Sequence, residues 1–186
     1  NILGSMFAKE ASEDAAPSVG GQGREFAWTD ADFERVQGMI YKRAGISLHD
    51  GKHAMVYSRL SRRLRETGYR SFREYLSWLE SSDGPEWQEF INALTTNLTS
   101  FFREQHHFEI FADRLRSKTT NSSWRIWCSA ASTGEEPYSI AMAALEVLGE
   151  HPKLTIVASD IDSKVLASAA RGVYRVDGLK GVDASR

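Results

Sequence analysis

Apolar residues recur at helical spacing in four stretches of the first half of the chain. Phe33, Val36 and Ile40 share one helical face, and Thr29 precedes them in the position of an N-cap. Glycine, serine and proline signals predict three further helices, at residues 50–68, 72–79 and 85–94. The turns between these helices are short, which is typical of antiparallel neighbours. The pattern therefore predicts a small all-α bundle.

The pattern changes after residue 103. A helix is predicted near 106–115, followed by a strand, a helix, a strand and a helix at 124–128, 137–148, 154–159 and 163–171. This order begins a parallel α/β sheet of the Rossmann-like kind. Because an open doubly wound sheet has about five or six strands, two strands predict a domain that is truncated at its C-terminus.

We therefore expect three segments. Residues 1–25 are interpreted as a cloning scar and a disordered tail, because they are rich in small and acidic residues without periodicity. Residues 26–103 are expected to form a helical N-terminal domain, and residues 104–186 a partial α/β domain.

The composition favours a cytoplasmic protein. No apolar run reaches the roughly 20 residues that cross a bilayer, so no membrane insertion is expected. The start of the chain lacks the features of a secretory signal. Cys128 is the only cysteine, which fits a reducing compartment. Its place in a predicted strand favours a packing role over nucleophilic catalysis.

Two loops at the ends of the predicted strands are candidates for ligand binding. The first strand runs into small residues at 129–134, where a ligand could approach the backbone closely. The second strand ends at Asp160, 26 residues after Gly134. An acid in that position can accept hydrogen bonds from both ribose hydroxyls of a nucleoside. A tight turn followed by a helix-capping Asp remains the alternative interpretation.

The first loop argues against a pyrophosphate ligand. It lacks the GxGxxG of dinucleotide sites and the GxxxxGK[ST] of phosphate loops. Glu135 and Glu136 occupy the expected helix N-terminus, where their charge would repel a phosphate and is itself stabilised by the helix dipole. A ligand with a ribose, no phosphate and a cationic sulfonium fits better, and S-adenosylmethionine (SAM) is such a ligand. This reasoning excludes NAD more strongly than it establishes SAM.

Five segments, in order along the chain, carry a specific resemblance. They are 58–64 (SRLSRRL), 97–104 (NLTSFFRE), 127–139 (WCSAASTGEEPYS), 159–162 (SDID) and 170–174 (ARGVY). Together they resemble the chemotaxis receptor methyltransferases (CheR), over residues 26 to about 174. The resemblance implies an all-α domain followed by a SAM methyltransferase domain. It also implies methyl transfer from SAM to glutamate side chains of methyl-accepting chemotaxis receptors in sensory adaptation, with S-adenosylhomocysteine as product.

The resemblance also implies a set of cofactor-binding residues: Asn97, Thr99, Arg103, Glu135 and Asp160. Glu135 would hold the methionine end of SAM, and Asp160 its ribose. Arg103 is a candidate positioning charge but not a general acid, because guanidinium stays protonated. The catalytic residue stays unassigned. The family continues past residue 174 into a small β-subdomain and further strands, so we expect weak SAM binding and little turnover from this shortened chain.

The second predicted helix lies in a basic region. Residues 41–75 contain nine basic and three acidic residues, which predicts an acidic partner. Arg59, Arg62 and Arg63 lie opposite the apolar face of the helix, and by resemblance they would meet the receptor's methylation region. A solvated polar face is the ordinary alternative. A nucleic-acid methyltransferase is disfavoured because aromatic residues do not alternate with the basic ones, so no nucleic-acid partner is expected.

Other features leave alternatives open. A non-catalytic module that binds receptors or senses SAM would carry the same motifs. His49 and His53 are four residues apart, but no third metal ligand is evident, so no metal site is expected. His106 and His107 are interpreted as residues that cap or decorate a helix. Phe101 and Phe102, beside Arg103, either belong to the core or shape the entry to the pocket.

Overall fold

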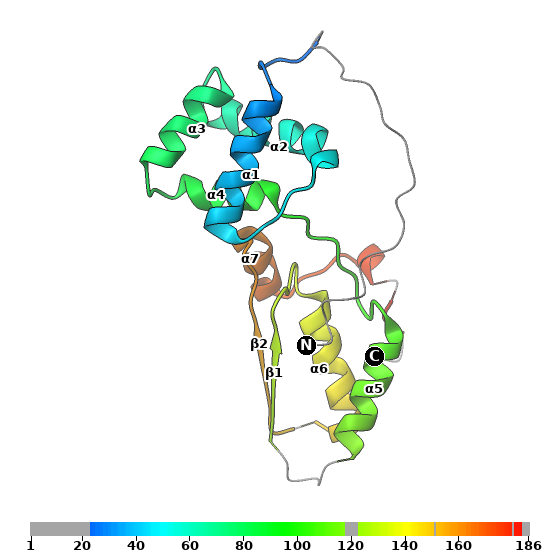
Figure 1. Ribbon diagram of the computed structural model, residues 1–186. Helices are drawn as coiled ribbons and strands as arrows, with labels where there is room; N and C mark the ends of the chain where they lie inside the picture. The colour runs from blue at the N-terminus through cyan, green and yellow to red at the C-terminus, as the bar shows by residue number, and fades with distance from the viewer. Residues whose placement is uncertain (1–22, 118–122, 151, 180, 184–186) are drawn as a thin grey trace.

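Four helices pack into a bundle in the first half of the chain, as the apolar spacing predicts. The computed structural model describes residues 23–117, 123–150, 152–179 and 181–183, so most of the predicted tail at 1–25 lies outside the described residues. The bundle consists of α1 (Asp30–Ala44), α2 (His53–Thr67), α3 (Phe72–Ser81) and α4 (Glu86–Leu94), with a 3₁₀ turn η1 (Asp50–Lys52) before α2 (Figure 1).

Local signals begin and end these helices where the sequence places them. The Thr29 hydroxyl accepts a hydrogen bond from the Asp32 amide, and the Asp32 carboxylate accepts one from the Thr29 amide, which forms a capping box. Ser71 caps α3 through the Glu74 amide. Gly68 ends α2 in the left-handed conformation. The bundle encloses one apolar core, whose largest fully buried side chains include Phe33, Leu60, Phe72, Tyr75 and Phe90.

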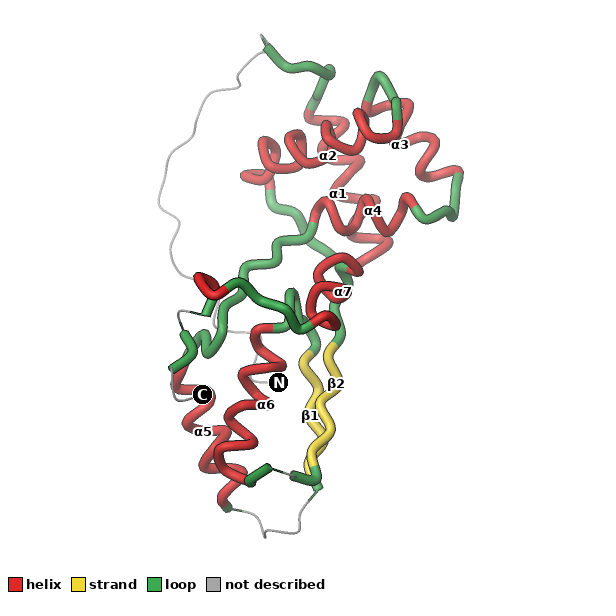
Figure 2. Tube along the Cα trace, turned by 180° about the vertical axis from the view of Figure 1, so that it is seen from behind, coloured by secondary structure: helices red, strands yellow, loops and turns green. Residues whose placement is uncertain are grey.

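The second half of the chain forms a layer of two helices on a two-stranded parallel sheet. After α5 (Gln105–Arg116), strands β1 (Trp124–Cys128) and β2 (Leu154–Ala158) pair in register from Trp124 with Leu154 to Cys128 with Ala158. Helix α6 (Glu135–Leu148) connects them, and both views place α5 and α6 on the same side of the sheet (Figures 1 and 2). The prediction of a parallel α/β sheet is confirmed.

Helix α6 begins earlier than predicted. We expected its start at Pro137, but Gly134 is the N-cap and Glu135 is the first helical residue. Both glutamates therefore lie in the first turn, where the helix dipole stabilises their charge. On the opposite face of the sheet, Trp127 and Val157 are 71% and 53% exposed.

Helix α7 (Ser163–Arg171) lies where the two halves of the molecule meet, against α4 (Figure 1). The chain continues through a second 3₁₀ turn, η2 (Val176–Gly178), back over the segment around Phe101. Within the described residues, no helix has the length and apolar character needed to cross a membrane.

Candidate active site

A cleft of about 900 Å³ opens at the carboxyl ends of β1 and β2. Ligands of doubly wound sheets bind at this edge, and small-molecule sites typically have volumes of about 300–1,000 Å³. The walls come from the segment joining the two halves, from α5, from the two strand-end loops and from the start of α6. The lining residues include Thr96, Asn97, Leu98, Thr99, Arg103, His106, His107, Phe108, Phe111, Ile126, Ala130, Ser132, Glu136 and Asp160.

The cleft collects four of the five predicted cofactor residues. Asn97, Thr99, Arg103 and Asp160 line it, whereas Glu135 does not. The Glu135 carboxylate instead accepts a hydrogen bond from the Thr133 hydroxyl at 2.6 Å, and the next residue, the exposed Glu136, lines the cleft. Consecutive helical residues differ by about 100° in direction, so only one of the two glutamates faces the cleft.

Asp160 is held by the main chain of both strand-end loops. Its Oδ2 accepts from the Ser132 amide and its Oδ1 from the Asp162 amide, each at 2.8 Å. A carboxylate has about four acceptor sites, so each oxygen can still accept a hydroxyl group. This arrangement suits an acid that receives the two hydroxyls of a ribose.

Asn97 is tied to a buried acid, Asp162, to which the sequence analysis assigned no role. Its Nδ2 donates to Asp162 Oδ2 at 2.7 Å, and Asp162 is 3% exposed. The same oxygen accepts from the Thr95 hydroxyl at 2.7 Å. Asp162 Oδ1 caps α7 through the Lys164 amide at 2.9 Å. The second Asp of the SDID string therefore has a role that spacing alone did not disclose.

The loop between β1 and α6 is held in place by a hydrogen bond from Tyr174, which follows α7 in the chain. Ser132 and Gly134 have φ angles of +48° and +101°, and the Tyr174 hydroxyl donates to the Thr133 carbonyl at 2.7 Å. Burial, with the charge of Glu135 as a second cause, raises the pKa of Tyr174 to about 12. Tyr174 therefore stays a neutral donor that holds the loop.

The joining segment places Arg103 at the cleft and puts the preceding phenylalanines inside the core. Arg103 Nη1 donates to the Leu98 carbonyl at 3.0 Å, which closes the turn between them. Phe101 and Phe102 are 6% and 8% exposed and pack with Ala143 of α6. Of the two interpretations, the core role is therefore the one observed.

Comparison with known proteins decides the family. The model for the CheR methyltransferase all-alpha domain matches residues 31–95, and the model for the CheR methyltransferase SAM binding domain matches residues 97–186. This chain belongs to the CheR methyltransferase family. The match to a SAM binding domain supports SAM as the cofactor, the ligand that the loop chemistry favoured over NAD.

Several chemotaxis protein methyltransferases are similar to this CheR-family chain. The protein from Escherichia coli (strain K12) is 52% identical over 158 residues, which cover 84% of this chain and 54% of that protein. The Salmonella typhimurium protein is 52% identical over 159 residues, with the same coverage. Chemotaxis protein methyltransferase 2 of Pseudomonas aeruginosa is 50% identical over 171 residues, covering 91% and 60%. The chain thus spans about half the length of the curated relatives it matches.

The basic helix of this CheR-family chain has fewer free charges than its sequence suggests. Arg63 has a side chain 13% exposed and pairs with Glu86 at 2.5 Å and with Glu66. The hydrogen bonds that Arg63 donates to the Glu86 carboxylate raise the pKa of Arg63, against the effect of burial. Arg59 donates to the Thr95 carbonyl at 2.5 Å and binds the end of α4. Of the three arginines predicted to bind the receptor, Arg62 is the most exposed: its side chain is 76% exposed and pairs with Glu66 at 2.8 Å.

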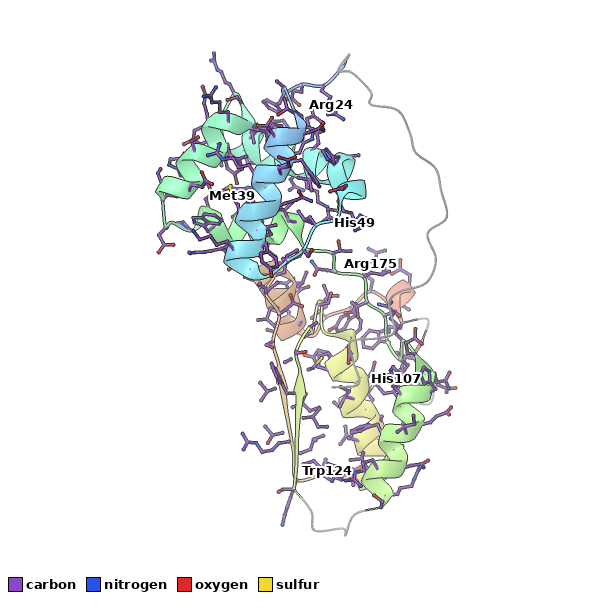
Figure 3. All side chains as sticks on the ribbon, in the orientation of Figure 1. Arg24, Met39, His49, His107, Trp124 and Arg175 are labelled. Atoms are coloured by element: carbon purple, nitrogen blue, oxygen red, sulfur yellow. The ribbon has the colours of Figure 1, made fainter. Side chains whose placement is uncertain are left out.

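The four histidines that the structure describes divide between structural and cleft positions. His53 stacks on Phe33 with ring centroids 3.6 Å apart, and His49 lies at the edge of the bundle (Figure 3). In the described part of the chain, no group of three or more His, Cys, Asp or Glu could hold a metal ion. His106 and His107 line the cleft. These two histidines closely follow the segment 97–104 (NLTSFFRE), and this was the one sequence signal that could have predicted their position in the cleft.

Proposed function

We propose that this chain is part of a SAM-dependent methyltransferase that modifies glutamate side chains of methyl-accepting chemotaxis receptors in the cytoplasm. The observation that supports this most directly is the cleft at the strand ends, where Asp160 keeps free acceptor capacity beside Asn97, Thr99 and Arg103. The relatives named as chemotaxis protein methyltransferases support the same reaction class.

The cleft has the chemistry that a nucleoside with a positive charge needs. Asp160 offers acceptors to the ribose, and Glu136 places a carboxylate at the wall. Phe108, Phe111 and Ile126 provide an apolar surface for a flat ring. SAM, when bound, supplies a methyl group on a sulfonium. An acceptor carboxylate is already ionised at neutral pH, so this chain needs no general base.

The chain's own contribution is orientation and exclusion of water. Asn97, Thr99 and Asp160 would hold SAM at the strand ends, so that its methyl group would face a carboxylate that enters the cleft. The hydrogen bond from Arg103 to the Leu98 carbonyl orients the guanidinium. In this orientation, Arg103 is positioned to attract the acceptor carboxylate into the cleft. Such positioning lowers the barrier by removing the entropy of encounter.

Binding of S-adenosylhomocysteine, measured by calorimetry, tests the cofactor site. Asp160→Ala is expected to weaken binding by about tenfold or more, because charged hydrogen bonds to the ribose are lost. Asp113→Ala is the matched control, since Asp113 is an exposed acid on α5 that pairs, among the residues the structure describes, with the nearby Arg116. Equal affinity of a folded Asp160→Ala variant and the wild type would exclude this role.

Receptor binding by the basic helix is the finer part of the proposal. Arg62 is the residue to test, because reversal of Arg59 or Arg63 would also break internal contacts. In the full-length protein, Arg62→Glu is expected to raise the KM for a receptor fragment by at least about tenfold at low salt, without changing cofactor affinity. Arg116→Glu, an exposed Arg in a comparable helical ion pair on α5, is the control. If both reversals act alike, or neither acts, the basic helix is not the contact.

A further inference from the structure

Four hydrogen bonds form a closed ring at the base of the cleft. Asn97 Nδ2 donates to Asp162 Oδ2 at 2.7 Å, and the Asp162 amide donates to Asp160 Oδ1 at 2.8 Å. The Ser132 amide donates to Asp160 Oδ2 at 2.8 Å, and the Ser132 hydroxyl donates to the Asn97 carbonyl at 3.2 Å, which closes the ring. Asn97, Ser132 and Asp160 line the cleft, whereas Asp162 does not.

The two oxygens of Asp162 have separate partners. Oδ1 accepts from the Lys164 and Val165 amides at 2.9 and 3.3 Å, which is the whole of the helix cap. Oδ2 accepts from the Thr95 hydroxyl and from Asn97, both at 2.7 Å. All the acceptor sites of this buried carboxylate are therefore used. A helix cap needs only one of the oxygens, so the second oxygen has a different role.

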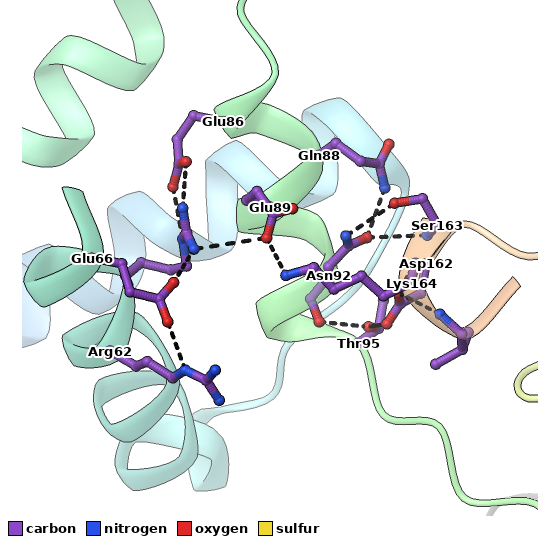
Figure 4. A network of polar contacts seen from close by, with 12 residues as sticks. Arg62, Glu66, Glu86, Gln88, Glu89, Asn92, Thr95, Asp162, Ser163 and Lys164 are labelled. Carbon is purple, nitrogen blue, oxygen red and sulfur yellow. Dashed lines mark hydrogen bonds and ion pairs between the residues drawn. The ribbon is translucent and has the colours of Figure 1, made fainter. Parts of the chain in front are cut away.

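A polar network extends from this ring into the bundle (Figure 4). Asn92 of α4 exchanges hydrogen bonds with Ser163 at 3.1 and 3.2 Å, and Gln88 donates to the Ile161 carbonyl at 2.8 Å. Lys164 of α7 pairs with Glu89 of α4. These contacts attach α7 to α4. They make no hydrogen bond to Asn97 or Asp160, so they can be removed separately from the ring.

We propose that Asp162 is a positioning residue for the cofactor cleft, acting through Asn97 and Asp160. Its Oδ2 fixes the rotation of the Asn97 amide, and its main-chain amide fixes one oxygen of Asp160. Together with Thr95, which directly follows α4, Asp162 also ties the shape of the cleft to the docking of the helical bundle. This inference rests on the proposed function, because it concerns the same cleft.

The test compares two variants at the junction of α4 and α7, with S-adenosylhomocysteine as the probe. Asp162→Asn keeps an oxygen for the helix cap but turns an NH₂ group toward the Asn97 and Thr95 donors. It is expected to raise Kd about tenfold, as for the loss of one hydrogen bond to a charged group. Asn92→Ala removes two hydrogen bonds from the same junction and leaves the ring intact. It is expected to change Kd by less than about twofold.

A double-mutant cycle separates positioning from general stability. If Asp162 acts through Asn97, then Asp162→Asn in an Asn97→Ala background should weaken binding less than in the wild type, by a factor of about three or more. Should Asp162→Asn fail to fold, Asp162→Ser replaces it, because Ser also caps helices but is too short to reach the joining segment.

The outcomes are distinct. A weaker Kd for the Asp162 variant alone, with coupling to Asn97, supports the inference. Unchanged affinity in a folded Asp162 variant, equal weakening by Asn92→Ala, or additive effects in the cycle would overturn it while leaving the proposed function in place. If the full-length wild-type protein binds no S-adenosylhomocysteine, the proposed function is overturned, and this inference with it.

Discussion

Replacement of Gly134 by Ala tests how closely α7 approaches the loop after β1. Gly134 has φ +101° and ψ −2° and begins α6. A Cβ built on it would lie 2.5 Å from the Tyr174 hydroxyl oxygen, 2.9 Å from Ala169 Cβ and 3.1 Å from Ala169 Cα. The tyrosine hydroxyl can swing away, but the Ala169 backbone cannot move unless α7 moves with it.

The expected loss of stability has two parts. A left-handed conformation costs a residue with a Cβ about 1 kcal/mol relative to Gly. Overpacking against α7, with the hydrogen bond from Tyr174 to the Thr133 carbonyl lost, adds about 2 kcal/mol. Gly68→Ala isolates the first part, because Gly68 has φ +80° and ψ 7° and its added Cβ would meet nothing within 4 Å.

Hydrogen exchange measured by mass spectrometry reports each half of the chain separately. Gly134→Ala is expected to accelerate exchange in peptides from β1 and α6 by about 100-fold, which corresponds to roughly 3 kcal/mol. Gly68→Ala should accelerate exchange about fivefold in α2 peptides and leave β1 unchanged. Adding Tyr174→Phe should recover part of the loss caused by Gly134→Ala, because the closest clashing atom is then absent.

The result that refutes this reasoning is specific. If Gly134→Ala accelerates exchange around its site no more than Gly68→Ala does around its own, backbone conformation accounts for the whole effect. The claim that α7 packs too closely against the loop to admit a Cβ at residue 134 would then be wrong. Gly134 would be needed only for its backbone conformation.

Three further outcomes are expected. In urea titrations, Glu86→Ala should lower the free energy of unfolding by about 2 kcal/mol, because it removes the main partner of the mostly buried Arg63. Glu80→Ala, which breaks an exposed pair, should lower it by less than about 0.5 kcal/mol. The pKa of Tyr174 is raised from 10.0 to about 12, so the unfolded chain loses this proton at a lower pH than the folded one. The free energy of unfolding of the wild type should therefore fall between those pH values, and that of Tyr174→Phe should fall less. Equal slopes for the two proteins would contradict the shift. Burial raises the pKa of Cys128, so iodoacetamide at pH 8 should modify it about 100-fold more slowly in the native than in the denatured protein; equal rates would place this thiol at the surface.

Much of the local structure could be predicted from the sequence, because short-range physics determines it. The N-cap at Thr29, the helix end at Gly68 and the span of α7 all depend on residues within a few positions of each other. The strand-end position of Asp160 also followed from pattern, since parallel strands bring their carboxyl ends to one edge. The order of elements and the kind of cleft were therefore determined by sequence alone.

Which side chain of a pair faces the cleft could not be predicted in this way. The choice between Glu135 and Glu136 depends on the residue at which α6 begins, and a shift of one residue turns a side chain by about 100°. Gly134 can start the helix earlier than Pro137 because its φ of +101° is open to glycine.

Only the tertiary structure decided which charges are free. Arg63 and Glu86 are 23 residues apart in sequence, yet they pair at 2.5 Å, so a face that looks basic in sequence is partly neutralised by α4. Asp162 looks like a helix cap until Asn97, 65 residues before it, is seen to donate to its second oxygen. Helical periodicity assigns a side chain to a face of its helix, but its partner depends on packing between segments distant in sequence, which periodicity does not specify.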